Sequence, residues 1–255
     1  MPADIAKLKQ IIISSDNIVF FGGAGVSTES GIPDFRSADG LYSESYAYPP
    51  ETILSYSFFK SNTEEFYRFY MEKILYPDAK PNNAHKALAT LEKQGKLKAV
   101  ITQNVDGLHE EAGSKNVIEL HGSALRNLCM KCKDCYPVDI IINSKKVPLC
   151  KCGGIIKPDV VLYEEGLSPV VISKATKTIC EADVLIVGGT SLNVYPAAGM
   201  INYYRGSNLV LINKSETPYD KYADLIIRES IGQTLNDAVT TPREPVHVTP
   251  SAEGN

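Results

Sequence analysis

Residues 18–27 have the sequence IVFFGGAGVS, and this stretch decides the fold class. Ile18–Phe21 is a short, uninterrupted apolar run, which is typical of a strand buried on both faces of a parallel sheet. Two glycines end the run, and a third follows at Gly25. Glycine permits positive φ and lets backbone N–H groups approach a phosphate. The stretch therefore predicts a buried strand followed by a phosphate-binding turn.

This glycine-rich turn differs from the dinucleotide fingerprint of dehydrogenases. That fingerprint, G-x-G-x-x-G, requires glycine where this chain has Thr28. No second strand ending in an acidic residue follows about 20 residues later. A tight strand-to-helix turn without a ligand is the alternative, and the position directly after the first strand favours phosphate binding.

Further apolar runs repeat this pattern along the chain, at Leu97–Ile101, Val184–Val187, Leu209–Ile212 and Leu225–Ile227. Helical periodicity separates them, in the stretches Ile5–Ser14, Ala84–Gln94, Val170–Cys180 and Ala197–Tyr204. Alternation of strands and helices predicts an α/β fold with a parallel sheet.

Two segments depart from the alternation and are interpreted as insertions into the α/β core. Residues 37–80 are rich in Tyr, Ser, Phe and Pro and contain one expected helix, Glu64–Leu75; residues 126–155 hold five of the six cysteines. The expected core comprises residues 1–36, 81–125 and 156–240. Residues 241–255 are proline-rich and are expected to form a flexible tail.

Composition narrows the function classes. A chain of 255 residues can bury a large core without disulfides. The chain has 26 basic and 30 acidic side chains. Its net charge of −4 therefore does not indicate that the protein as a whole binds nucleic acid. No stretch approaches the roughly 18 apolar residues of a membrane span, and no signal peptide is recognised. We therefore expect a cytoplasmic protein with reduced thiols, whose cysteines serve metal binding or catalysis.

Four cysteines have the spacing of a metal site. The pair Cys129 and Cys132 is separated by 17 residues from the pair Cys150 and Cys152. Two close pairs at this distance predict a tetrahedral zinc site, which is structural because four protein ligands leave no open position. The second pair is C-x-C instead of C-x-x-C, so Cys135 is an alternative ligand. Cys180 is expected to be a small buried side chain.

Polar residues follow the strand Leu97–Ile101 and suggest a ligand site. Gln103, Asn104 and Asp106 offer amide donors and a carboxylate, which suit ribose hydroxyls and a carboxamide. Helix capping is the alternative. His121 follows a short apolar segment and precedes a glycine, where an imidazole is suited to general-base catalysis, although a structural histidine is the commoner case. His85, at the start of a predicted helix, is assigned to capping or packing.

Taken together, these motifs resemble the sirtuins, a family of NAD-dependent protein-lysine deacylases. The matching segments occur in family order over nearly the whole chain: Gly23–Ser27, Gly31–Ser37, Thr102–His109, Leu120–Gly122, the two cysteine pairs, Lys157–Val161 and Gly189–Leu192. The resemblance implies a Rossmann-like core with an inserted zinc-ribbon module and an inserted helical module. NAD as co-substrate and one structural zinc are implied as well.

The resemblance also implies roles for individual residues. The phosphates and the nicotinamide-ribose region would be lined by Ala24, Thr28, Phe35 and Arg36. The nicotinamide ribose and carboxamide would be contacted by Gln103, Asn104, Val105 and Asp106. The adenosine end would be bound by Thr190, Ser191, Asn213 and Ile231. The acyl-lysine peptide would lie as an added strand between two segments, contacting Val160, Val161, Leu162, Tyr163, Leu192 and Val194.

In the family's reaction, the acyl oxygen attacks the ribose and expels nicotinamide. His121 would then accept a proton from a ribose hydroxyl, and the products would be the deacylated lysine and O-acyl-ADP-ribose. Asp34 and Asp106 would favour the cationic transition state.

Two departures from the family pattern bear on substrate choice. The family's Phe-Gly-Glu is Tyr163-Glu164-Glu165 here, and the added charge of Glu164 is expected to favour basic peptides. Desuccinylases of the family carry Tyr-x-x-Arg on the inserted helix, whereas this chain has Tyr70 in place of the arginine. We therefore expect a preference for acetyl and other neutral acyl groups.

Other functions remain open at this point. A mono-ADP-ribosyltransferase of the same family is the nearest alternative, and a non-enzymatic module in which the fold senses nucleotide is another. We expect acetylated lysine peptides as partners, no membrane, no specific nucleic acid, and a monomer.

Overall fold

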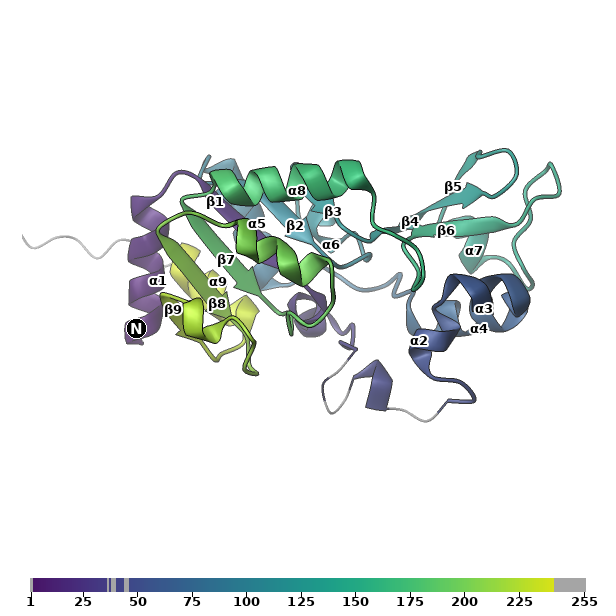
Figure 1. Ribbon diagram of the computed structural model, residues 1–255, viewed down its shortest axis with the longest axis horizontal. Coiled ribbons are helices and arrows are strands. Elements are labelled where there is room, and N and C mark those ends of the chain that lie inside the picture. Colours follow the sequence, from purple (N-terminus) through teal and green to yellow (C-terminus); the bar gives the residue numbers. More distant parts are fainter. Residues whose placement is uncertain (1, 36, 38–39, 44–45, 241–255) are drawn as a thin grey trace, which may run out of the picture.

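The protein is described here by a computed structural model, which covers residues 2–35, 37, 40–43 and 46–240. Figure 1 shows an elongated molecule with a large lobe built on a parallel sheet and a small lobe at its other end. The expected tail, residues 241–255, and the predicted cofactor residue Arg36 lie outside the described residues. Among the residues described, no helix is long and apolar enough to cross a membrane.

The large lobe contains a six-stranded sheet in the order β3-β2-β1-β7-β8-β9, and every neighbouring pair is parallel. The strands are β1 (Ile18–Gly22), β2 (Leu97–Thr102), β3 (Val117–Glu119), β7 (Val184–Gly188), β8 (Asn208–Ile212) and β9 (Leu225–Ile227). All five residues of β1 are buried. Ile18 and Phe20 enter one core and Val19 and Phe21 the other, because successive side chains point to opposite faces.

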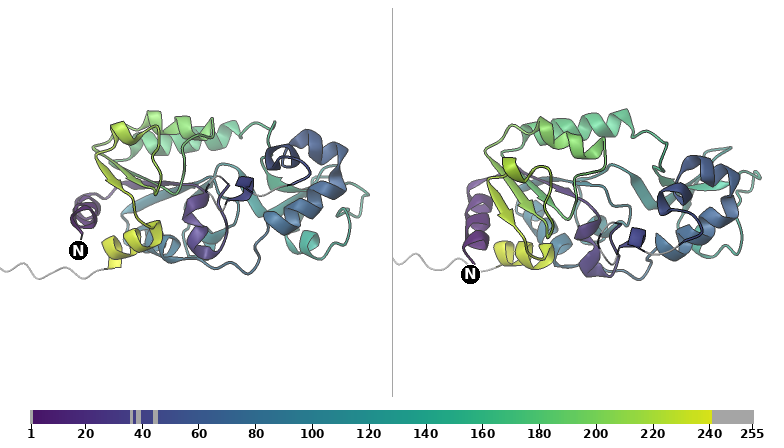
Figure 2. Two further views of the ribbon diagram at one scale, coloured as in Figure 1. Left: turned by 90° about the horizontal axis from the view of Figure 1, so that it is seen from below. Right: turned by 60° about the horizontal axis from the view of Figure 1, so that its bottom comes forward.

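Helices cover both faces of this sheet, as Figure 2 shows. One face packs against α1 (Ala3–Ser14), α5 (Asn83–Lys93) and α9 (Ile231–Thr240), and the other against α8 (Pro169–Glu181) and η4 (Ala197–Tyr203). The short helix α6 (Leu108–Glu111) follows β2. The mixed α/β fold with a parallel, Rossmann-like sheet is therefore confirmed.

The strand order reverses between β1 and β7, and glycines allow the two strand ends to meet. The Gly25 N–H donates to the Gly189 carbonyl over 2.8 Å. A Cβ on Gly189 would lie 2.4 Å from the Val26 nitrogen, and Gly189 has a φ of +59°. These close contacts leave no room for a side chain at either glycine. Backbone groups therefore line the carboxyl edge of the sheet, which is where open α/β sheets bind ligands.

The small lobe combines the two segments that the sequence marked as insertions, and Figure 1 shows them together although they are far apart in the chain. Its sheet has the order β5-β4-β6, made of β4 (Gly122–Cys129), β5 (Cys135–Pro137) and β6 (Ile156–Val160). Its helices are α2 (Pro50–Ile53), α3 (Tyr56–Ser61), α4 (Thr63–Lys73) and α7 (Asp139–Ile142). The proposed domain boundaries themselves stay a prediction.

Aromatic rings hold the small lobe together. Phe59 and Tyr67 each pack edge to face on Phe66, and Tyr70 stacks on the same ring at 5.5 Å. The buried Tyr67 hydroxyl donates to the Ile156 carbonyl, which joins α4 to the strand β6. The insertion 37–80 and the cysteine-bearing segment thus share one apolar cluster.

Two local predictions are wrong. Residues 37–80 contain three α-helices in their described part instead of one. The predicted helical stretch Ala197–Tyr204 is confirmed and is a 3-10 helix that ends at Tyr203. Cys180 is exposed, because it shares a helix face with Ser173 and Lys177 while Ala175 and Ile179 face the sheet.

Candidate functional site

Polar side chains from β1 and β2 meet beyond the carboxyl ends of these strands. The buried Ser27 hydroxyl donates to the Asp106 carboxylate over 2.7 Å and accepts from the Asn104 amide over 3.0 Å. Asp106 also accepts the Leu108 N–H at the start of α6, whose N-cap residue is Gly107. Asp106 thus satisfies one backbone donor at the helix start and belongs to the polar network, while ligand binding by this cluster stays a prediction.

Gln103 immediately precedes Asn104 of this network, and its own contacts reach the ends of two further strands. Its side-chain amide donates to the Thr190 hydroxyl over 3.0 Å, beyond the end of β7. Its backbone carbonyl lies 2.9 Å from His121 Nδ1, beyond the end of β3. Residues predicted for the nicotinamide side, for the adenosine end and for catalysis are thus joined through one glutamine.

The environment of His121 fixes its tautomer. Because a carbonyl oxygen only accepts hydrogen bonds, the contact with Gln103 places the proton on Nδ1 and leaves Nε2 as the basic nitrogen. Burial lowers the pKa of His121 below its ordinary value, and the hydrogen bond to Gln103 partly opposes this shift. A neutral imidazole with a free Nε2 lone pair near pH 7 is suited to accept a proton.

The turn after His121 depends on a glycine. Gly122 has a φ of +78°, and a Cβ there would lie 2.0 Å from the Asp159 carbonyl oxygen. The His121 carbonyl accepts the Val161 N–H over 3.0 Å. The histidine backbone is therefore attached directly to the segment predicted to bind the peptide.

The residues predicted for the phosphates lie on or beside short 3-10 turns. Ala24 is on η1 (Ala24–Val26), and Thr28, on η2 (Thr28–Ser30), donates to the Gly25 carbonyl. Phe35 packs against Tyr42. Val105, which is predicted for the nicotinamide ribose and carboxamide, follows β2 and accepts the Ala124 N–H through its carbonyl.

The residues predicted for the adenosine end surround the ends of β7 and β8. Ser191 follows Thr190 and is half-buried. The Asn213 side chain donates to the Ser215 carbonyl within its own loop. Ile231 begins α9 and lies against Gly188, whose missing side chain makes room for it.

The residues predicted for the peptide occupy both lobes. Val160–Tyr163 extends from β6, whereas Leu192 and Val194 follow β7. Leu162 and Leu192 are each less than 5% exposed and belong to different apolar clusters. Val160, Val161 and Val194 are half-buried, and Tyr163 is 39% exposed. No interaction described for these residues joins the two segments.

Glu164 has a structural partner. Its carboxylate accepts from the Ser57 N–H over 2.9 Å and from the Ser57 hydroxyl over 2.8 Å, at the first turn of α3. Its φ is +75°, a region that favours glycine. The charge is thus engaged by α3, and the expected preference for basic peptides stays a prediction.

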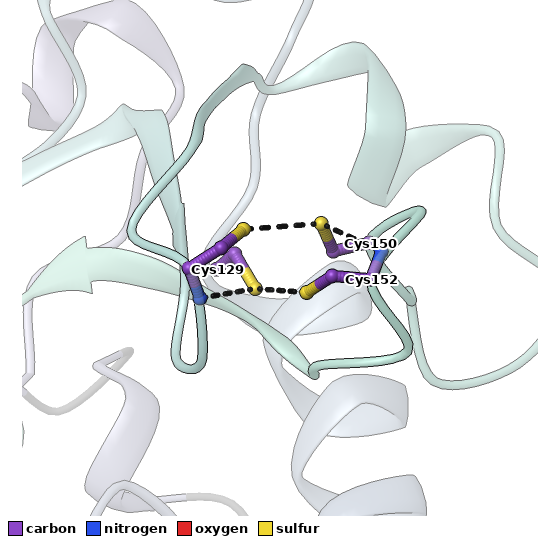
Figure 3. Close-up of side chains that lie close together, drawn as sticks. Cys129, Cys150 and Cys152 are labelled. Atoms are coloured by element: carbon purple, nitrogen blue, oxygen red, sulfur yellow. Dashed lines mark hydrogen bonds between the residues drawn. The ribbon is translucent and has the colours of Figure 1, made fainter.

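The four predicted zinc ligands converge. Their sulfur atoms all lie within 4.8 Å of one another, with 3.5 Å between Cys129 and Cys152 and 3.5 Å between Cys132 and Cys150. Figure 3 shows the sulfurs directed towards a common centre. A tetrahedron with zinc–sulfur bonds of about 2.3 Å has edges of about 3.8 Å, so the set fits zinc. Cys135, the alternative ligand, is exposed and outside this cluster.

Hydrogen bonds support the two buried thiols of this quartet. Cys129 Sγ accepts the N–H groups of Lys131 and Cys132, both at 3.4 Å. Cys150 Sγ accepts the Tyr136 hydroxyl at 3.0 Å and the Cys152 N–H at 3.4 Å. Such donors stabilise thiolates and orient them towards a metal.

Two residues of the site were absent from the predicted set. Ser27 lies within a segment that matched the sirtuin pattern, so its motif was visible while its partners were not. Glu29 accepts the Gly232 N–H over 2.8 Å and fixes the start of α9 beside Ile231. No local signal pairs two residues that are 203 positions apart.

Comparisons with known proteins agree on one family. Residues 23–196 match the model of the Sir2 family. An NAD-dependent protein deacetylase of Clostridium perfringens is 62% identical over 243 residues, which cover 94% of this chain and all of the relative. The deacetylase of Clostridium acetobutylicum is 59% identical over 239 residues, covering 92% of this chain and 98% of the relative.

Solved structures show the same likeness. A complex of a Sir2 homologue with NAD is 42% identical, with a TM-score of 0.83 and 92% of each chain covered. A Sir2 complex with a p53 peptide and NAD⁺ is 41% identical, with a TM-score of 0.80, covering 91% of this chain and 95% of that one.

Proposed function

The chain belongs to the Sir2 family, and we propose on this basis that it is an NAD-dependent protein deacetylase. It removes acetyl and other neutral acyl groups from lysine side chains of proteins and releases nicotinamide and O-acyl-ADP-ribose. The observation that carries the proposal is that two hydrogen-bonded groups lie at the edge where the strand order reverses. One joins Ser27 to Asn104 and Asp106, and the other joins Gln103 to Thr190 and His121.

The chemistry of the network supports NAD as the co-substrate. The carboxyl edge of an open α/β sheet is where such folds bind nucleotides. The close approach of the Gly25 and Gly189 backbones keeps side chains away from the end of β1, and Gln103, Asn104 and Asp106 offer donors and an acceptor to ribose hydroxyls. Each of these roles is part of the proposal.

His121 is proposed as the general base. Its Nδ1 is held by the Gln103 carbonyl, so Nε2 is free to take the proton of a ribose hydroxyl while that oxygen attacks the acyl carbon. Burial keeps the imidazole neutral, as this step requires. The zinc supplies no step in this scheme: held by Cys129, Cys132, Cys150 and Cys152, it stabilises the small lobe.

The inserted helix α4 supports a preference for neutral acyl groups. Tyr70, which replaces the arginine of desuccinylases, is 1% exposed and lies in the aromatic cluster. Arg68, the arginine of this helix, is on its outer face in an ion pair with Glu65. Lys73, at the end of α4, lies over the Tyr46 ring and 3.5 Å from Glu72. The Tyr-x-x-Arg position of α4 therefore offers no cation to a negatively charged acyl group. With one peptide in two forms, deacetylation is expected to exceed desuccinylation by tenfold or more, about the discrimination of one charge-assisted hydrogen bond; faster desuccinylation contradicts this preference.

The direct test is to incubate the purified protein with NAD and an acetylated peptide and to measure free nicotinamide and deacetylated peptide. A deacetylase forms both products in equal amounts and only when both substrates are present. Nicotinamide without deacetylation identifies NAD glycohydrolysis or ADP-ribosyl transfer, the nearest alternative. Absence of product identifies a nucleotide-sensing module. We also propose, from the sequence, that the protein is cytoplasmic and monomeric.

A further inference from the structure

A hydrogen bond joins Tyr42 to Tyr163 of the predicted peptide segment, 121 positions later in the sequence. The hydroxyl oxygens of Tyr42 and Tyr163 are separated by 2.6 Å, near the short end of the range for O–H···O bonds. Tyr163 lies on the segment predicted to bind the peptide. Tyr42 follows Phe35, which is predicted to bind the cofactor. The bond therefore runs directly between the two substrate sites.

Tyr42 and Phe35 are held together as one unit. The Tyr42 N–H donates to the Phe35 carbonyl over 2.9 Å, and the Leu41 N–H donates to the Asp34 carbonyl over 2.8 Å. The rings of Phe35 and Tyr42 meet edge to face, with their centroids 5.7 Å apart. A displacement of the Tyr42 ring therefore displaces Phe35 as well.

Tyr163, in contrast, is fixed to the small lobe through its backbone. Its N–H donates to the Leu54 carbonyl, and its carbonyl accepts the Tyr56 N–H, both over 3.0 Å. The next residue, Glu164, binds Ser57 at the start of α3. The Tyr163 hydroxyl thus extends from an anchored backbone to the Tyr42 ring, which packs at the edge of the small lobe's apolar cluster.

From this geometry we infer that Tyr163 is a positioning residue for the cofactor, although it lies on the peptide segment. Its hydroxyl holds Tyr42, and Tyr42 holds Phe35 where the phosphates and nicotinamide ribose are proposed to bind. The sirtuin pattern has phenylalanine at this position, which has no hydroxyl, so the bond is a feature of this chain. The inference rests on the proposed function, because it assigns Phe35 to the NAD site.

The test measures ligand binding by calorimetry, separately for ADP-ribose and for an acetylated peptide. ADP-ribose keeps the phosphates and both riboses of NAD but has no nicotinamide to release, so binding is observed without turnover. Tyr163→Phe removes only the hydroxyl and keeps the ring. Its Kd for ADP-ribose is expected to rise about fivefold, the effect of one ordinary hydrogen bond, while its Kd for the peptide changes less than twofold.

A double-mutant cycle identifies the bond as the cause. Tyr42→Phe is expected to raise the ADP-ribose Kd by the same factor, and the double variant no further, because both substitutions remove one interaction. Tyr203→Phe is the matched control, since Tyr203 is 54% exposed and is not one of the residues assigned to ligand binding. It is expected to bind ADP-ribose like the wild type.

Each other outcome is decisive. Additive effects in the double variant, an unchanged ADP-ribose Kd, or a change confined to the peptide Kd overturns the inference and leaves the proposed function in place. Failure of the wild-type protein to bind ADP-ribose overturns the proposed function itself, and the inference with it.

Discussion

The two lobes are stabilised by different means. The large lobe rests on continuous apolar strands, and its sheet is buried by helices on both faces. The small lobe has a three-stranded antiparallel sheet, and its stability comes from packed aromatic rings and four cysteines. The polar network of the proposed active site lies on the large lobe, whereas Tyr163 and the zinc site belong to the small one. The zinc site and the proposed catalytic network therefore belong to different lobes, and we expect loss of one to leave the other folded.

Loss of one zinc ligand should damage the small lobe alone. Cys150→Ala is expected to lower the zinc content from about one ion per chain to near zero, because three thiolates bind zinc far more weakly than four, and structural zinc supplies much of the folding free energy of small modules. Hydrogen exchange should then lose protection in β4–β6 and keep it in β1 and β7. Cys135→Ala, an exposed cysteine outside the quartet, is the control. Equal loss of protection in both lobes contradicts the separation.

Acid should weaken the large lobe through two buried histidines. Burial lowers the pKa of His85 to about 4 and that of His109 to about 3, and the rings contact each other at 4.7 Å. In the unfolded chain both take up protons near pH 6.5, so between pH 6.5 and about 4 the unfolded state binds more protons. The free energy of unfolding should therefore fall with falling pH, by about 1.4 kcal/mol per pH unit for each histidine.

Urea titrations across this pH range measure the effect, and one substitution identifies its source. Both ring nitrogens of His109 are buried without a hydrogen-bond partner among the residues that the structure describes. His109→Leu should therefore be tolerated near pH 7 and should lose about half of the pH dependence. The same slope in the variant and the wild type would exclude His109 as a contributor.

Removal of the Ser27 hydroxyl should affect chemistry more than stability. Ser27→Ala removes the donor to Asp106 and the acceptor of Asn104. A hydrogen bond to a charged group contributes about 1.5–3 kcal/mol, so kcat/KM for NAD is expected to fall roughly ten- to a hundredfold. Thermal unfolding and steady-state kinetics are measured on the same preparation. A wild-type kcat/KM with a lowered Tm would assign Ser27 to folding only.

Much of the large lobe could be predicted because its signals are local. Each apolar run, such as Ile18–Phe21, is a strand in the structure, since burial on both faces requires an uninterrupted run. The start of α5 also followed from local chemistry: His85 accepts the Asn82 N–H in a capping box. The burial predicted for Cys180 is wrong because an apolar helix still has an exposed face. The helical period places Ile179 on the buried face and Cys180 on the exposed one.

The small lobe was harder to predict because its contacts are long-range. The spacing of the cysteines predicted their convergence, which is confirmed, since metal coordination leaves a regular pattern. The contact of Tyr67 with Ile156 and that of Tyr42 with Tyr163 leave no such pattern. The helices α2 and α3 are too short to show a periodicity. The predicted roles of the site residues still await experiment.

The most direct test of the account concerns His121, the proposed general base on which the two lobes converge. His121→Ala should bind ADP-ribose within twofold of the wild type, because its side chain contacts the Gln103 carbonyl and the adenosine end is untouched. Its rate of peptide deacetylation should fall by about 10²- to 10⁴-fold. Zinc content and Tm verify that the variant is folded. A folded His121→Ala protein that deacetylates the peptide at near wild-type rate would contradict the account.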